Sequence, residues 1–263
     1  MRRSLFFIIL GFKTLFIYRT TLIFYSIGNF IFVIVTWFLW KAIYLNERVI
    51  NGMTFEQTFV YLAMATSIFS LFQTSTDWSL SARINNGGIM MDLLKPVRQI
   101  HFTFFTSLGF VITNFLAIAV PSLFLMFFVF NVKLVFGLNI PFFLVSIILA
   151  YGISFNIDYM VGTTAFYNEA IWGICITKEV VMLFLSGALL PLSFFPDSIR
   201  RVAELLPFQA IYNLPLQILV SKTLTPRDYL NAIIIQLFWL AALSIASRLF
   251  FHTASRRLTV NGG

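Results

Sequence analysis

Charged residues are scarce in this sequence. Asp, Glu, Lys and Arg make up 11% of the 263 residues, whereas they make up about a quarter of an ordinary soluble domain. Hydrophobic residues account for 59%, and the mean hydropathy is +0.90. This composition excludes a water-soluble globular fold and indicates a membrane protein with several spans. The chain has space for about six spans and short connections, but not for a separate soluble catalytic domain.

Residues that bind metals or phosphates are also rare. Cys175 is the single cysteine, so an intrachain disulfide is excluded. His101 and His252 lie at expected span boundaries without a His, Cys or acidic partner at metal-ligand spacing. No Gly-Lys pair occurs, which excludes the phosphate-binding loop of ATPases. We therefore expect no catalytic residues, no metal site and no cofactor bound by this chain, and the sequence shows no basic patch suited to nucleic acid.

Long apolar runs predict an all-α membrane protein that forms a single transmembrane domain over residues 1–263. Lys13 and Arg19 divide the first run, so we expect an interfacial helix over residues 1–19 rather than a cleaved signal peptide. Six transmembrane helices then fit between residues 20 and 251, followed by a polar tail at 252–263. The expected spans are 20–45, 55–75 (continuing as a polar helix through Arg83), 100–130, 141–166, a fifth ending at Leu190, and 229–251.

The distribution of Lys and Arg predicts the orientation. Basic residues near both ends of the chain flank the first and last spans, and basic residues concentrate on the cytoplasmic side of membranes. We therefore expect both termini in the cytoplasm and residues 196–221 outside. The formal net charge of +8 is consistent with this orientation and with contact to anionic lipid.

A broken segment follows the fifth expected span. Residues 187–221 are apolar, but prolines interrupt them so often that no piece between two prolines reaches the roughly 20 residues of a span. Such a segment can enter the membrane and return, which makes residues 191–221 a candidate re-entrant helix on the outer face. The alternative is an interfacial loop that connects two spans. The prolines are Pro191, Pro196, Pro207 and Pro215.

The fourth and fifth expected spans contain charged residues. Asp158 lies in the fourth span, and Lys178 and Glu179 lie in the inner part of the fifth. Charges at such positions are costly and usually face the interior of the bundle. We interpret them as a possible intramembrane polar site, the alternative for Asp158 being a satisfied contact between helices. Lys178 and Glu179 are neighbours and cannot face each other on a helix, so each must contact another helix or the lipid headgroups.

Two motifs give the chain a family resemblance. The stretch GALLPLSFFPDSIRRVAELLPFQAIYNLP resembles the signature between the last two spans of type-2 ABC transporter permeases. The loop INNGGIMMDLLKPVRQ and the ending RRLTVNGG are similar to the same family, which includes bacterial drug, antibiotic and polysaccharide exporters. The resemblance covers essentially the whole chain.

The resemblance implies a permease subunit without an ATPase of its own, in the bacterial cytoplasmic membrane. It implies a homo- or heterodimer with a second permease chain, and separate ABC ATPase subunits that bind ATP and Mg. The expected substrate is apolar or amphipathic: a drug, antibiotic, peptide, lipid or glycan. A self-sufficient secondary transporter is the alternative.

In the family the cytoplasmic loop, here residues 84–96, contacts the ATPase, which implies a contact at Gly87, Gly88, Ile89, Met90, Asp92, Leu93, Leu94, Lys95 and Pro96. The broken segment forms the outer lid of the cavity, here Pro191, Pro196, Pro207, Phe208 and Pro215.

Overall fold

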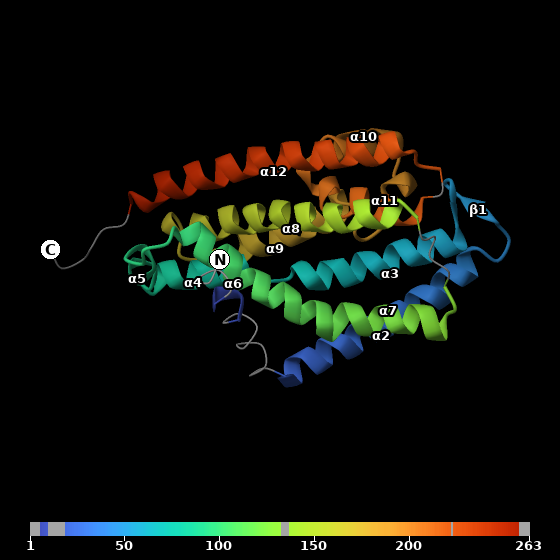
Figure 1. Ribbon diagram of the computed structural model, residues 1–263, viewed down its shortest axis with the longest axis horizontal. Coiled ribbons are helices and arrows are strands. Elements are labelled where there is room, and N and C mark those ends of the chain that lie inside the picture. Colours follow the sequence, from blue (N-terminus) through green and yellow to red (C-terminus); the bar gives the residue numbers. More distant parts are fainter. Residues whose placement is uncertain (1–5, 10–18, 133–136, 222, 258–263) are drawn as a thin grey trace.

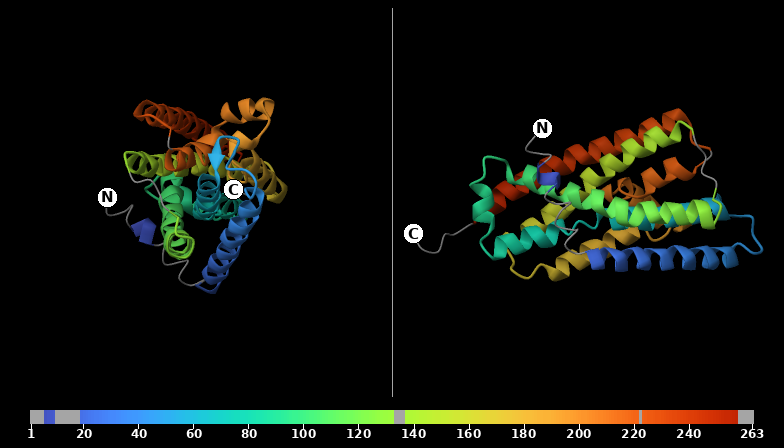
Figure 2. Two further views of the ribbon diagram at one scale, coloured as in Figure 1. Left: turned by 90° about the vertical axis from the view of Figure 1, so that its right-hand side faces the viewer. Right: turned by 60° about the horizontal axis from the view of Figure 1, so that its bottom comes forward.

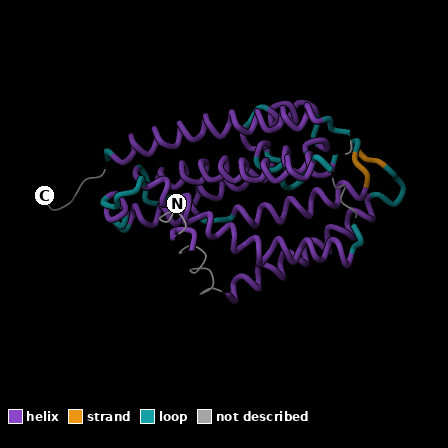
Figure 3. The backbone as a smooth tube through the Cα atoms, in the orientation of Figure 1, coloured by secondary structure: helices purple, strands orange, loops and turns teal. Residues whose placement is uncertain are grey.

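A computed structural model describes residues 6–9, 19–132, 137–221 and 223–257 of the chain. Within these residues the protein is a bundle of long helices with one short hairpin (Figures 1 and 3). Five stretches, three of which contain more than one helical element, are long and apolar enough to cross a membrane: Leu22–Ile43, Phe55–Asn85, Gln99–Val129, Asn139–Phe166 and Pro226–Ser255. The prediction of an all-α membrane protein is therefore confirmed at this level.

The elements follow one another in the expected order. The first half of the chain contains α2 (Arg19–Ile43), β1 (Val49–Ile50), β2 (Met53–Thr54), α3 (Phe55–Phe72), α4 (Thr76–Asn85), α5 (Ile89–Leu93), α6 (Gln99–Asn114), η1 (Phe115–Ala119), α7 (Val120–Phe124) and η2 (Leu125–Val129). The second half contains α8 (Asn139–Thr163), η3 (Thr164–Phe166), α9 (Trp172–Leu185), η4 (Leu192–Phe194), α10 (Asp197–Glu204), η5 (Pro207–Ala210), α11 (Asn213–Val220) and α12 (Pro226–Ser255).

The hairpin between α2 and α3 was not expected. β1 and β2 pair antiparallel, with Val49 opposite Thr54 and Ile50 opposite Met53. Asn51 and Gly52 connect them with φ angles of 47° and 80°. This is the Asn-Gly pair that two-residue hairpin turns favour, because both central residues need positive φ. Thr54 and Gln57 then form a capping box that starts α3.

The helix α3 is the centre of the bundle. Two thirds of its most apolar window is buried, against 17% for the windows of α2 and α12. α8 packs against α12, α4 and α11, while α2 packs against α3 and the α6–α7 region (Figure 2). Polar contacts fasten α2 there: Ser26 donates to the carbonyl of Ala117, and Asn29 donates to Ser122. Most of the large apolar side chains of α2 are exposed, as expected for a helix that faces lipid or a second protein chain.

The two ends of the bundle differ in construction. α5 and the C-terminal end of α12 lie at one end of the molecule, and the hairpin and α10 lie at the other (Figure 1). This agrees with the predicted separation between the loop at 84–96 and the broken segment. We call the two ends the α5 end and the hairpin end.

Four expectations need correction or lie partly outside the described residues. The second span does not continue smoothly into its polar extension, because residues 73–75 interrupt the helix and Ser75 has a φ of 50°. The fifth helix, α9, ends at Leu185 rather than Leu190 and has 14 residues, about 21 Å, which is too short to cross a bilayer alone. Of the expected interfacial helix at 1–19, residues 6–9 are described and are helical, and the end of the tail at 258–263 lies outside the described residues.

Candidate functional site

The loop expected to contact an ATPase forms a compact turn at the α5 end. Gly87 has a φ of 74°, a conformation that favours glycine, and it allows α4 to end and α5 to begin within a few residues. Ile89 is fully buried against the bundle. The side chain of Asp92 is also buried and accepts charge-assisted hydrogen bonds from Arg83 of α4 and from Lys95, whose Nζ lies 2.7 Å from its Oδ1. We call this arrangement of Arg83, Asp92 and Lys95 the α5 bracket.

Two of the expected contact residues have partners within the chain. Asp92 is buried, and the ammonium of Lys95 lies between Asp92 and the ring of Phe102, 3.9 Å from the ring centre. The charges therefore hold α5 against its own chain. Arg83, nine residues before Asp92, was not among the candidate site residues.

The apolar residues of the same loop divide into two groups. Ile89 is buried and Met90 is half-buried, so these two anchor the helix. Leu93 and Leu94 are 45% and 79% exposed, and Met91, which was not a candidate, is 67% exposed. Gly87, Lys95 and Pro96 are exposed, and Gly88 is partly buried. The loop thus presents apolar side chains outward on a base that is held by ion pairs.

The broken segment runs from Ser186 to Ser221 at the hairpin-end half of the molecule. Pro191 precedes η4, Pro196 precedes α10, Pro207 begins η5, and Pro215 lies in the first turn of α11. Each proline lies where the missing N–H costs no helical hydrogen bond. α10 and α11 have eight residues each, so neither can span. The prediction that prolines divide this segment into short pieces is confirmed.

Buried side chains attach the broken segment to the bundle. Gly187 has a φ of 83°, and its carbonyl accepts a hydrogen bond from Tyr61 of α3 at 2.9 Å. Gln236 of α12 donates to the carbonyl of Ala210 at 2.7 Å and to that of Ser146 in α8 at 3.1 Å. Phe208, a candidate lid residue, is half-buried against the main core. The segment is therefore joined to α3, α8 and α12.

Lys178, Asp77 and Asp158 form a cluster of charges that we call the Lys178 triad. The ammonium of Lys178 in α9 lies 2.8 Å from Asp77 Oδ2 in α4 and 2.8 Å from Asp158 Oδ1 in α8. Both carboxylates are almost fully buried. Asp158 thus makes the interhelical contact that was the alternative to a substrate or proton site, and Lys178 contacts other helices as expected. Asp77 was missed as a site residue, since its partner lies 101 positions away.

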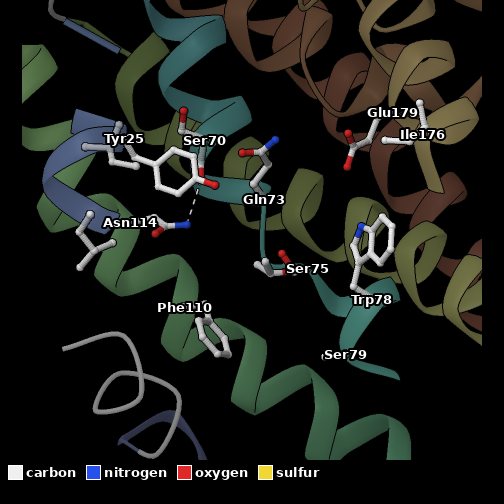
Figure 4. A pocket seen from close by; sticks show the side chains of 13 residues that line it. Tyr25, Ser70, Gln73, Ser75, Trp78, Ser79, Phe110, Asn114, Ile176 and Glu179 are labelled. Atoms are coloured by element: carbon white, nitrogen blue, oxygen red, sulfur yellow. Dashed lines mark hydrogen bonds between the residues drawn. The ribbon is translucent and has the colours of Figure 1, made fainter. Parts of the chain in front are cut away.

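Glu179 does not belong to the triad but faces a cavity beside it. The cavity has a volume of about 460 Å³ and lies between α2, the break after α3, α4, α6 and α9 (Figure 4). Its polar lining includes Gln73, Asn114 and Glu179, and Asn114 donates to the carbonyl of Ser70 at 3.0 Å. A smaller hollow that Gln73 and Glu179 also line leads to Asp158 and Lys178. The three predicted intramembrane residues therefore lie together, whereas the loop at 84–96 and the broken segment form separate regions.

The comparisons with known proteins agree with a transport role. No curated protein matches the sequence closely enough to count as a relative. A family model described as "ABC-2 family transporter protein" matches residues 30–262, which is nearly the whole chain. The match includes the loop with the α5 bracket, the Lys178 triad and the broken segment. With this match and a bundle of apolar helices long enough to cross a membrane, the chain belongs to the ABC-2 family of transporter proteins.

Proposed function

We propose that this chain is the permease subunit of an ATP-driven exporter in a bacterial cytoplasmic membrane. Separate ABC ATPase subunits would bind ATP and Mg, and a second permease chain, identical or different, would complete the pathway. The proposal follows from the family and from the absence of a phosphate-binding loop in the sequence. The expected cargo is an apolar or amphipathic molecule.

The observation that carries the proposal is the exposed apolar surface of α5. Leu93 and Leu94 extend from a short helix whose buried side is fixed by Ile89 and Asp92. Exposed leucines on a water-facing loop are unfavourable unless a partner covers them. Because the α5 bracket makes the loop rigid, a displacement of a bound partner would be transmitted to α4 rather than absorbed by the loop. These are the properties needed at a contact between a permease and its ATPase.

The proposed topology has six crossings with both termini in the cytoplasm. Five of these crossings are the candidate spans described above. The additional crossing, which comes fifth along the chain, would consist of α9 and the irregular residues that follow it, including Gly187 and Pro191. Irregular backbone is tolerated at membrane depth where protein surrounds it, and both of these residues are buried. The broken segment would re-enter from the outside and close the outer end of the pathway. ATP binding would draw the inner loops together and open this lid, and hydrolysis would reset it.

The proposal can be tested by changing Leu93 and Leu94 to Asp together. Tagged permease would be purified from native membranes, and the ATPase activity of the eluate would be measured. We expect wild-type permease to retain ATPase activity and the double variant to lose it, because burying two unpaired carboxylates costs several kcal/mol. Asp92→Asn should weaken the activity less, since it loosens the bracket without adding charge to the surface.

The matched control is Leu45→Asp with Val49→Asp. These residues are 75% and 53% exposed and lie at the hairpin end, far from α5 (Figure 1). This variant should retain the ATPase. If no ATPase activity accompanies the wild-type chain, or if the Leu93/Leu94 variant retains it, then α5 is not the site of coupling.

A secondary transporter is the second candidate, and one observation favours it. The break at residues 73–75 is a second interrupted helix in addition to the broken segment, and it lies beside a buried charge cluster. Secondary transporters often place such breaks at the substrate site. Uptake into inverted vesicles separates the two functions. With a protonophore present, uptake by an ATP-driven exporter continues as long as ATP is supplied. Uptake by a proton-coupled transporter stops under the same condition.

A further inference from the structure

We propose that the cavity between α2, α3, α4, α6 and α9 binds a lipophilic cation, with Glu179 as its counter-ion. Binding itself requires only this chain. The role of the bound cation as the exported substrate rests on the proposed function. The inference depends on the size, lining and charge of the cavity, which are considered in turn.

The cavity has the size and lining of a small-molecule site. Its volume of about 460 Å³ lies within the range of roughly 300–1,000 Å³ that is typical of ligand pockets. Aromatic rings come from three helices: Tyr25 from α2, Trp78 from α4 and Phe110 from α6. Trp78 and Glu179 lie on one side in Figure 4, and Tyr25 lies across from them. Aromatic faces attract cations as well as apolar groups.

Charge determines which ligand fits. Of the 13 lining residues, Glu179 alone is charged. Among the side chains that the structure describes, no Lys or Arg forms a salt bridge with Glu179. Lys178, the residue before Glu179, is already shared between Asp77 and Asp158. Among the described side chains of the triad and the cavity lining, three carboxylates therefore accompany one ammonium, which leaves an excess of negative charge.

The interrupted helix adds to this negative potential. The C-terminal end of α3 carries the negative end of the helix dipole, and its last turn contains no basic residue to offset it. The positive end of α4 begins at the same break. There Asp77 lies in the first turn and accepts a hydrogen bond from the backbone N–H of Trp78 at 2.9 Å, so that end is already compensated. The cavity consequently favours a positive ligand.

The remaining lining limits the ligand to an amphiphile rather than a small inorganic ion. Leu22, Ile118 and Ile176 are apolar, and a hydrated ion would gain nothing from them. A molecule with a delocalised or amine-borne positive charge and an apolar body would use both the carboxylate and the rings. The cavity lies toward the α5 end of α3, which is the inner side in the proposed orientation, where an exporter receives its cargo.

The test uses two ions of nearly equal size and opposite charge, tetraphenylphosphonium and tetraphenylborate. The purified permease would be placed in nanodiscs of zwitterionic lipid without ATPase or nucleotide. Binding would be measured by equilibrium dialysis, with empty nanodiscs subtracted. We expect saturable binding of the phosphonium only. Glu179→Gln should weaken it about tenfold, which corresponds to about 1.4 kcal/mol.

The matched control is Glu56→Gln, which removes the same charge from an exposed position at the other end of α3. It should bind the phosphonium as the wild type does. Trp78→Leu is a second variant of the site, expected to weaken binding without changing charge. Equal binding of both ions, or unchanged affinity in both Glu179→Gln and Trp78→Leu, would overturn the proposal. Phosphonium binding by a chain that brings no ATPase activity with it when purified from native membranes would refute the proposed exporter while leaving the cation site intact.

Discussion

Lys178 and Asp158 face each other across two helices, with the ammonium nitrogen 2.8 Å from a carboxylate oxygen. Asp77, on a third helix, lies at the same distance from the same ammonium. One positive charge thus joins α4, α8 and α9 inside the bundle. Each of its partners is a carboxylate that would otherwise be buried without a cation.

Removing the ammonium should therefore destabilise the protein strongly. Lys178→Met keeps much of the side-chain volume but leaves two buried carboxylates without compensation. We expect a loss of about 3–5 kcal/mol in stability, the usual cost of breaking a buried ion pair from one side. Thermal unfolding of the detergent-solubilised protein, followed by size-exclusion chromatography, measures the effect.

The control for this variant removes all three charges at once. Combining Lys178→Met with Asp77→Asn and Asp158→Asn leaves no charge at the triad, so most of the lost stability should return. A Lys178→Met protein that unfolds at the wild-type temperature would show that the triad does not hold the helices together.

Gly162 allows α4 to approach α8 closely. A Cβ atom added there would lie 2.9 Å from the carbonyl oxygen of Asp77 and 3.0 Å from its Cα, and backbone atoms cannot rotate away. Gly162→Ala should push α4 outward and cost about 1–3 kcal/mol, as overpacking does. The measurement is again the unfolding temperature.

Gly173 provides the comparison for Gly162. It lies in α9, and a Cβ atom added there would meet nothing within 4 Å. Gly173→Ala should be neutral or stabilise the helix by up to about 1 kcal/mol. Equal unfolding temperatures for the two variants would contradict the close approach of α4 to α8.

The orientation of the chain can be tested by cysteine labelling. Cys175 is buried and would be changed to Ser, and Ser198, which is exposed on α10, would be changed to Cys. An impermeant maleimide added to intact cells should label position 198. Thr253→Cys, exposed near the end of α12, should be labelled only after the membrane is opened. The reverse pattern would invert the proposed topology.

Local chemistry explains which parts of the fold could be predicted from the sequence. Proline is disfavoured in helix interiors, so the interruptions at Pro196 and Pro207 could be inferred without knowledge of their surroundings. The family resemblance extended this reading to a transporter, and the family match confirms the family. Asn51-Gly52 carried an equally local hairpin signal that was overlooked.

Other features depend on residues far apart in the chain and were not predicted. The break before Asp77 contains neither Pro nor Gly, and Ser75 takes its left-handed conformation where α4 is held by Gly162 and Lys178. The exposed and buried sides of α5 likewise depend on the turn at Gly87, which brings Asp92 to Arg83. Neither the contact of α4 with Lys178 nor the contact of Asp92 with Arg83 can be inferred from helical periodicity, because a turn or another helix lies between the partners in the sequence.

The hydrogen bonds of Gln236 make α12 a rigid lever. From Gln236 the helix continues toward the α5 end for about 28 Å, to Ser255. Its interior contains neither proline nor glycine at which it could bend. A tilt of about 5° at the level of Ala210 would therefore displace the far end by roughly 2.5 Å. Tilting α12 at the hairpin end without moving its α5 end would require breaking the bonds from Gln236 to Ala210 and Ser146. One uninterrupted helix thus links movement at the hairpin end to movement at the α5 end.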